Sequence, residues 1–270
     1  MNKIQTIAIC ALALLTGACA SDEPQGGDAA VILTLMAPEA LTRSGQAVGD
    51  ASAIDRLEYV VYDISAGKSG LFDHGVISSG VTFPMDLNLQ LITGHEYGIL
   101  LWAASQSAPY SLSEEGVLTV NYSEVLANSE TLDGFYAYRT LILNGNTQLD
   151  VEMKRPFAMV DIGASTLPEG DVQTSITVTD APSGLNLLTG ELTGKTTTAI
   201  FDYAPIPDVA YGVAGYSTLA YTYVLATAEP EYYSLTYSYK VGGASPVEKA
   251  VDNVALQANY RTNIYGSLPN

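Results

Sequence analysis

Apolar and polar residues alternate with a period of two, or form short apolar runs, over most of the chain after residue 29. Both patterns are typical of β-strands, and no long stretch in this part shows the 3.6-residue period of a helix. The segments concerned are residues 30–36, 57–64, 87–91, 97–102, 117–122, 138–143, 149–153, 157–162, 176–178, 196–201, 221–226, 233–241 and 260–266. Short strands at such regular spacing predict an all-β fold built from antiparallel β-sandwiches.

Turn-forming residues divide this series into two halves of roughly seven strands each. We place the boundary between two tandem β-sandwich domains after residue 155, which gives residues 44–155 and 156–270. In the first half, Asn144-Gly145-Asn146-Thr147 separates two strand-like segments. Asn-Gly in this position is the strongest short-range signal for a hairpin, so we expect the two flanking strands to pair with each other.

The first strand-like segment, residues 30–36, is a nearly continuous apolar run. Such a run favours a strand that is buried on both faces of its sheet. Because neighbouring side chains of a strand point to opposite faces, one face receives Val31, Leu33 and Leu35, and the other Ile32 and Met36.

The first 18 residues have the layout of a secretory signal peptide. Lys3 supplies a positive charge, residues 4–15 are largely apolar, and small residues precede Cys19. The apolar stretch is shorter than the ~20 residues that span a bilayer. Its end resembles a bacterial lipobox, although Thr16 stands where that motif usually has leucine, and a lipobox implies lipidation of Cys19. The alternative is an ordinary signal peptide followed by an incidental cysteine.

Net charge narrows the range of partners. The chain has 11 Lys and Arg against 29 Asp and Glu, a formal charge of −18. A nucleic-acid partner is therefore not expected, because binding to phosphates needs a basic surface. Hydrophobic residues make up 47% of the chain and charged residues only 15%, which indicates a folded protein rather than a disordered acidic one.

Candidate catalytic groups are few. His74 and His95 lie in no metal-binding spacing, and we interpret both as turn residues. Glu114 and Glu115 could supply the carboxylates of a glycoside hydrolase, but their Ser- and Gly-flanked position favours a solvated turn. Alternating tyrosines in residues 233–241 could form a binding face, although one flank of a sandwich is the favoured interpretation. We expect no enzymatic activity, no metal and no cofactor.

A candidate processing site lies in the small and polar segment 37–47. There Arg43 stands between Thr42 and Ser44, and exposed loops of this composition are preferred sites of proteolysis. We expect cleavage between Arg43 and Ser44. A solvated loop arginine is the alternative, and Arg56 is a less accessible second site because a strand follows it directly.

The order of these parts resembles the fimbrillins, which are subunits of lipoprotein-derived type V pili. The matching features are Cys19, strand 30–36, Thr42-Arg43-Ser44, residues 57–63, the junction 154–158 and the closing strand 259–266. The resemblance implies two transthyretin-like β-sandwiches after a lipoprotein signal peptide of residues 1–18. It also implies that residues 19–43 form a lipidated tether and propeptide that contains the first strand.

The same resemblance implies a function in adhesion. The precursor would be held in the outer membrane by the lipid of Cys19 and cut after Arg43 by an Arg-specific protease. Its removable strand would contain Val31, Ile32, Leu33, Leu35 and Met36, and other pilus subunits would supply the replacement. The chain has almost nothing after residue 266, whereas shaft subunits of that family usually continue with a donor segment. A tip or accessory subunit, a truncated form, and a subunit that donates its own last strand all fit this ending.

Two other classes of protein remain open. A surface glycan-binding outer-membrane lipoprotein that does not polymerise would keep its N-terminus at Cys19 and would present an exposed aromatic platform. A glycosidase would place two carboxylates opposite each other across a cleft.

Overall fold

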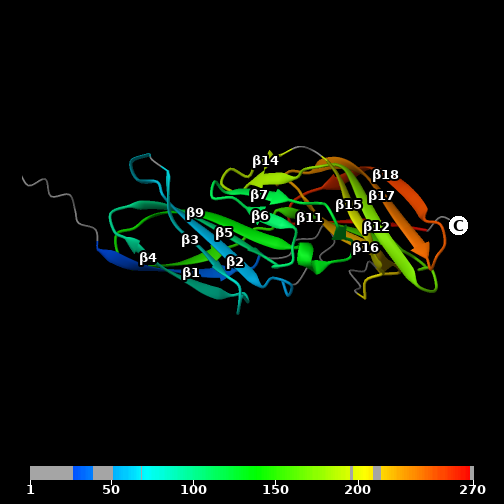
Figure 1. Ribbon diagram of the computed structural model, residues 1–270, viewed down its shortest axis with the longest axis horizontal. Coiled ribbons are helices and arrows are strands. Elements are labelled where there is room, and N and C mark those ends of the chain that lie inside the picture. The colour runs from blue at the N-terminus through cyan, green and yellow to red at the C-terminus, as the bar shows by residue number, and fades with distance from the viewer. Residues whose placement is uncertain (1–26, 39–50, 68, 195–196, 209–213, 268–270) are drawn as a thin grey trace, which may run out of the picture.

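The computed structural model describes residues 27–38, 51–67, 69–194, 197–208 and 214–267. This part of the chain is all-β, as predicted, with only two short 3-10 helices, η1 (Ser65–Gly67) and η2 (Glu130–Leu132). None of the helices among the described residues has the length and apolar character needed to span a bilayer. Two β-sandwiches lie end to end along the longest axis of the molecule (Figure 1).

The first sandwich consists of a three-stranded and a four-stranded sheet. The three-stranded sheet has the order β10-β1-β4, with strands β1 (Asp28–Met36), β4 (Met85–Ile92) and β10 (Thr147–Glu152). The four-stranded sheet has the order β3-β2-β5-β9, with strands β2 (Arg56–Asp63), β3 (Gly70–Ile77), β5 (Glu96–Ala104) and β9 (Gly134–Ile142). Alternate residues of these strands fill the core between the two sheets, where Val31, Leu57, Ile99 and Phe135 are fully buried.

The second sandwich follows the same plan. Its smaller sheet has the order β16-β11-β19, with strands β11 (Phe157–Ala164), β16 (Ser217–Leu225) and β19 (Arg261–Gly266). Its larger sheet has the order β18-β17-β12-β15-β8, with strands β12 (Val172–Ala181), β15 (Thr197–Pro205), β17 (Glu231–Val241), β18 (Val247–Leu256) and the short β8 (Val125–Leu126). The large sheet thus borrows its edge strand β8 from the first half of the chain.

The two sandwiches share one strand topology. In each, the first strand (β1 or β11) lies at the centre of the smaller sheet, parallel to the last strand (β10 or β19) and antiparallel to the fourth (β4 or β16). In the larger sheets, the order β3-β2-β5-β9 corresponds to β15-β12-β17-β18. The sheets are therefore mainly antiparallel, as the sequence predicts, but the strand that opens each sandwich runs parallel to the strand that closes it.

A fifth sheet joins the two halves. It has the order β14-β13-β7-β6, with strands β6 (Tyr110–Leu112), β7 (Val117–Val120), β13 (Gly184–Asn186) and β14 (Leu192–Thr193). Strands β7 and β13 come from opposite sides of Pro156 and pair antiparallel, with Leu118 opposite Leu185. The domain boundary after residue 155 stays a prediction, because hydrogen-bonded strands cross from one half to the other.

The β3-β2-β5-β9 sheet is apolar on both faces. Leu57, Val61 and Ile99 face the core of the first sandwich. Val60 and Trp102 face a second core, which also contains residues of the second sandwich. Burial on both faces explains why 57–64 and 97–102 are rich in apolar residues at consecutive positions.

The prediction of a hairpin around Asn144-Gly145-Asn146-Thr147 is wrong. Strand β9 pairs with β5 in one sheet, whereas β10 pairs with β1 in the other. The residues on the two sides of this turn pair with each other through an isolated bridge between Tyr136 and Lys154 and not through a hairpin ladder. The Asn-Gly segment therefore carries the chain from one sheet of the sandwich to the other, which its local sequence does not distinguish from a hairpin turn.

Candidate functional site

Strand β1, the strand that the sequence suggests is removable, lies between two partners. On one side it pairs with β10 in parallel, with Val31 opposite Thr147 and Met36 opposite Glu152. On the other side it pairs with β4 antiparallel over a longer stretch, from Asp28 to Leu35. Because both edges are paired, β1 is the central strand of its sheet, and among the described strands it alone connects β10 with β4.

The side chains of β1 alternate strictly between the core and the outside. Val31, Leu33 and Leu35 are fully buried in the first core, as predicted. The opposite face is not buried, contrary to the expectation from the continuous apolar run: Ile32 is half-buried and Met36 is 38% exposed. The neighbouring outward positions of β4 and β10 carry exposed polar residues, so no second layer of described residues covers this face.

Polar contacts fix the register of β1 at both ends. The side-chain oxygen of Asn146 accepts a hydrogen bond of 3.0 Å from the backbone N–H of Ala30. The hydroxyl of Thr34 donates to the Asp86 carboxylate at 2.8 Å. Beyond the strand, the carbonyl of Met36 accepts a hydrogen bond of 2.9 Å from the N–H of Met153. A shift by one residue would lose these bonds and turn the apolar side chains outward.

The predicted modification sites lie outside the described residues. These are Cys19, the lipidation site, and Arg43 with Ser44, the processing site. The description of the chain stops two residues after β1, at Pro38, and resumes at Ala51. Lipidation and cleavage therefore stay predictions, whereas the placement of the apolar residues of the strand is known.

Arg155, at the junction between the sandwiches, forms a buried ion pair that sequence reasoning missed. Its Nε and one terminal nitrogen donate to the two carboxylate oxygens of Asp133, at 2.7 and 2.9 Å. The other terminal nitrogen donates to the side-chain oxygen of Asn259 at 2.8 Å. The guanidinium carbon also lies 4.9 Å from the centre of the Phe135 ring. Three segments of the chain thus meet around one side chain, those of Asp133 and Phe135, of Arg155 itself and of Asn259.

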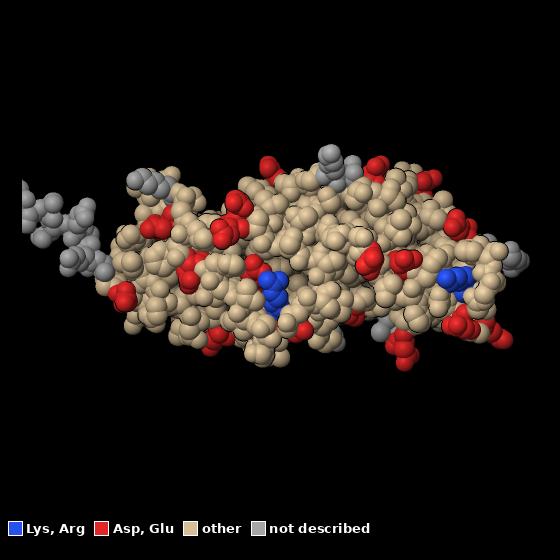
Figure 2. All heavy atoms as spheres, viewed as in Figure 1, with Lys and Arg blue, Asp and Glu red and all other residues tan. Residues whose placement is uncertain are grey.

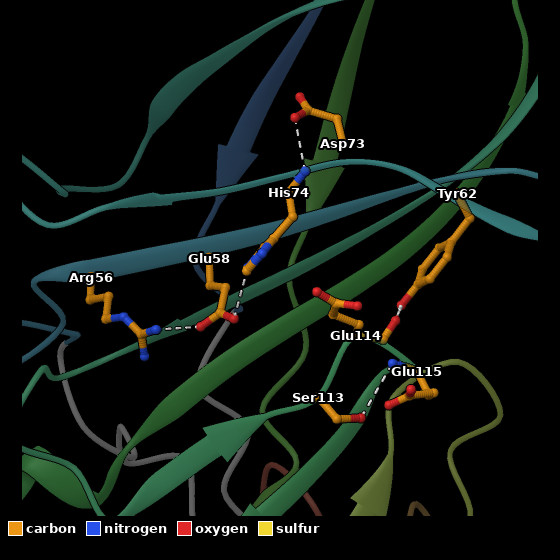
Figure 3. Close-up of polar contacts among 8 residues, drawn as sticks. All are labelled: Arg56, Glu58, Tyr62, Asp73, His74, Ser113, Glu114 and Glu115. Carbon is orange, nitrogen blue, oxygen red and sulfur yellow. Dashed lines mark hydrogen bonds and ion pairs between the residues drawn. The ribbon is translucent and has the colours of Figure 1, made fainter.

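The two candidate catalytic glutamates are exposed on a turn, as the sequence predicts. The hydroxyl of Tyr62 donates to the backbone carbonyl of Glu114 at 2.7 Å, not to its carboxylate (Figure 3). Burial is the main cause that raises the pKa of Tyr62 to about 12. A hydrogen bond from Ser113 lowers the pKa of Glu115, so this carboxyl lacks the raised pKa that a general acid needs.

The histidines differ from each other in position. His95 follows the turn at Gly94 and lies 2.7 Å from Asp63, as its Nδ1–Oδ2 distance shows. His74 lies on the edge strand β3 and not in a turn, contrary to its interpretation from the sequence, and its Nε2 is 3.1 Å from Glu58 (Figure 3). Asp73, His74 and Gly75 interrupt the apolar residues of β3 and break the alternation, which is why this strand is not evident in the sequence. Among the described residues, no three His, Cys, Asp or Glu side chains are grouped as metal ligands.

Comparisons with known proteins give a family and a fold. Residues 24–268 match the sequence profile of DUF6562, a family of unknown function, and the chain belongs to this family. No curated protein matches the chain in sequence.

Several solved structures with a similar fold come from Bacteroides species. A candidate adhesin from Bacteroides ovatus has a TM-score of 0.51 at 10% identity, and the match covers 83% of this chain and 78% of that chain. A candidate polysaccharide-binding protein from Bacteroides thetaiotaomicron VPI-5482 has a TM-score of 0.51 at 12% identity, over 88% and 90% of the two chains. Another candidate adhesin, from Bacteroides ovatus ATCC 8483, has a TM-score of 0.50 at 11% identity, over 98% and 99%. At these identities the likeness shows the fold alone.

Proposed function

We propose that this DUF6562 protein is a structural subunit of a cell-surface pilus that serves adhesion. It is made as an outer-membrane precursor lipidated at Cys19, is cut after Arg43 by an Arg-specific protease, and joins other pilus subunits by strand exchange. One observation carries this proposal. Strand β1 is the first strand of the fold, yet it is the central strand of its sheet and is enclosed by β10 and β4.

Cleavage after Arg43 would separate β1 from the rest of the chain. Loss of the strand would leave a groove between β4 and β10, with unpaired backbone groups on both sides. The pockets that Val31, Leu33 and Leu35 fill would be open to water. Each such side chain contributes about 1.5–3 kcal/mol when it is buried. An incoming strand from a neighbouring subunit would recover both the backbone bonds and the apolar burial.

The corresponding strand of the second sandwich is attached much more firmly. Every residue of β11 is buried, whereas β1 is buried on one face only. β11 follows directly after the buried Arg155, and no small polar segment with an arginine separates it from β12 as 37–47 separates β1 from β2. The contrast supports exchange at β1 and permanence at β11.

The fold supports a place at the cell surface. Two solved structures that share it are described as candidate adhesins. The signal-like residues 1–18 and Cys19 supply a route to the outer membrane for the precursor.

The test is to cut the purified precursor at Arg43 and to isolate the body without residues 1–43. We expect its midpoint of thermal unfolding to fall, and a synthetic peptide of residues 29–37 to restore it. A peptide in which Leu33 is replaced by aspartate is the matched control and should not restore stability. The proposal fails if the cut protein loses no stability, or if both peptides act alike.

A second candidate function is that of a surface glycan-binding lipoprotein that does not polymerise. The likeness to a candidate polysaccharide-binding protein favours it. N-terminal sequencing of the form found on cells separates the two functions: an N-terminus at Ser44 supports the pilus subunit, and an intact lipidated Cys19 supports the unpolymerised lipoprotein.

A further inference from the structure

A hollow of about 410 Å³ lies on the outer face of the β18-β17-β12-β15 sheet. Strand β17 contributes Tyr232 and Ser234 to its lining, and β14 contributes Leu192 and Thr193. The alternating tyrosines of β17 that the sequence offered as a binding face point inward instead, as the burial of Tyr237 shows. Tyr232, which lies outside that alternation, is 69% exposed at the hollow.

Both strands that flank β17 are bulged at the level of this hollow. In β12, two residues between Val178 and Ala181 stand opposite one residue of β15. One of the two is Asp180, which has φ +59°. In β18, the register shifts opposite Ser234, and Asn253 adopts φ +58°. Non-glycine residues rarely adopt this conformation, and bulges of this kind redirect side chains beside functional sites.

The polar groups brought together in this way have capacity for a ligand. Among the described residues, the side chains of Asp180 and Asn253 have no hydrogen-bond partner, and both line the hollow. A carboxylate and an amide can together accept and donate several hydrogen bonds.

We propose that this hollow binds a neutral saccharide. The face of the Tyr232 ring offers a flat apolar surface for the C–H face of a pyranose, and its two side-chain torsions make it an anchor of low entropy cost. Asp180 and Asn253 lie on the two strands beside β17 and also line the hollow, where they offer hydrogen-bonding groups to sugar hydroxyls. The lining includes Glu231 as well as Asp180 but no Lys or Arg among the described residues.

The charge of the site selects against acidic ligands. Two carboxylates without a cation repel phosphate, uronate and sialate groups. The chain as a whole has a formal charge of −18, and Figure 2 shows acidic side chains at many places on the visible face of the molecule and basic ones at only a few. The lining residues all fall between Thr179 and Asn253, so the inference does not depend on strand exchange or on cleavage at Arg43.

The test is calorimetric titration of the purified protein with hexasaccharides of glucose, mannose, galactose and N-acetylglucosamine, and with hexagalacturonate as the charged probe. We expect at least one neutral probe to bind and hexagalacturonate not to bind. Tyr232→Ala should weaken binding by about tenfold or more, and Tyr232→Phe should retain it because the ring face is kept. Tyr216→Ala is the matched control, because Tyr216 is also exposed but lies outside the hollow.

Asp180→Gly and Asn253→Gly separate binding from folding. Glycine adopts a positive φ without strain, so both variants should keep the bulges and the unfolding midpoint while they lose affinity. The proposal is overturned if no neutral hexasaccharide binds at millimolar concentration. It is equally overturned if Tyr232→Ala or both glycine variants bind as the unmodified protein does, or if hexagalacturonate binds as well as the neutral probes.

Discussion

Arg155 holds both carboxylate oxygens of Asp133, at 2.7 and 2.9 Å, at the point where the two sandwiches meet. Both side chains are almost completely buried, with 1% and 2% exposure. The pair joins the segment before β9 to the segment before β11, and Asn259 extends it to the segment before β19. The junction is therefore held by an ion pair and by the β7–β13 pairing, in addition to the chain itself.

Removal of one partner of this pair should be far more damaging than removal of both. Asp133→Leu leaves the charge of Arg155 buried without compensation, and we expect a loss of about 3–5 kcal/mol in the free energy of unfolding. The double variant Asp133→Leu/Arg155→Met should recover most of this loss. Urea unfolding of the three proteins measures both effects. Equal loss in the single and double variants would contradict this account of the junction.

The two faces of β1 should respond differently to the same truncation. Leu33→Ala removes a fully buried side chain and should cost about 2–5 kcal/mol. Ile32→Ala, on the half-buried face, should cost about 1 kcal/mol or less. The midpoints of chemical denaturation report the difference. Similar losses at the two positions would mean that the outer face of this sheet is covered after all.

Native trypsin should cut first after Arg43. Arg155 and Arg261 are each only 2% exposed, and Arg56 is held by Glu58 at 2.5 Å. Mass spectrometry of the early products should show the fragment that begins at Ser44, and Arg43→Gln should abolish it. Early cleavage after Arg56, with Arg43 left intact, would move the processing site to that second arginine.

Lipid attachment should depend on Cys19 alone. Labelled palmitate should enter the protein in cells, because a signal-like stretch ends in small residues before this cysteine. Cys19→Ala should lose the label and the association with membranes. Cys10→Ala should keep both, because Cys10 lies in the signal peptide that we expect to be removed. Equal labelling of Cys19→Ala would refute lipidation at this position.

Stability should depend on pH through Asp161. This carboxyl is fully buried on β11, and burial raises its pKa despite a hydrogen bond from Tyr265 and the nearby charge of Arg261. A raised pKa in the folded state means that the folded protein holds this proton more firmly than the unfolded chain. The contribution of Asp161 to the free energy of unfolding is thus complete below the pKa of an aspartate in the unfolded chain, about 3.9. It is lost as the pH rises through the pKa of Asp161 in the folded state.

Asp161→Asn removes this titration and keeps an acceptor for Tyr265. The variant should therefore gain stability relative to the unmodified protein as the pH rises from 4 to 7. Unfolding midpoints at a series of pH values measure the difference. A constant difference over this range would show that Asp161 does not titrate there.

The local pattern of the sequence predicts strands well and their partners less well. The alternation in 233–241 predicts β17 and the inward tyrosines, because burial of one face acts on each residue separately. The Asn-Gly turn after β9 shows the limit. A turn reverses or redirects the chain over a few residues, but pairing of β10 with β1 depends on residues more than a hundred positions away.

The sites show the same division. Glu114 and Glu115 are predicted to lie on a turn from their immediate neighbours alone. The pair of Asp133 and Arg155 is not, because 22 residues separate the partners and either one by itself resembles a surface charge. The bulges at Asp180 and Asn253 arise from register between strands, which leaves no periodic signal in a single sequence.

The parallel pairing of the first and last strands determines how each sandwich responds to tension. β1 enters the first sandwich and β10 leaves it in the same direction, and β11 and β19 do so in the second. A pull that enters by the first strand and leaves by the last loads all the hydrogen bonds between them in shear, whereas a hairpin would peel open one bond at a time. Because the sandwiches lie end to end (Figure 1), the same force passes through both pairs of strands in series. While β1 is attached, the fold is thus oriented to resist stretching along its own length.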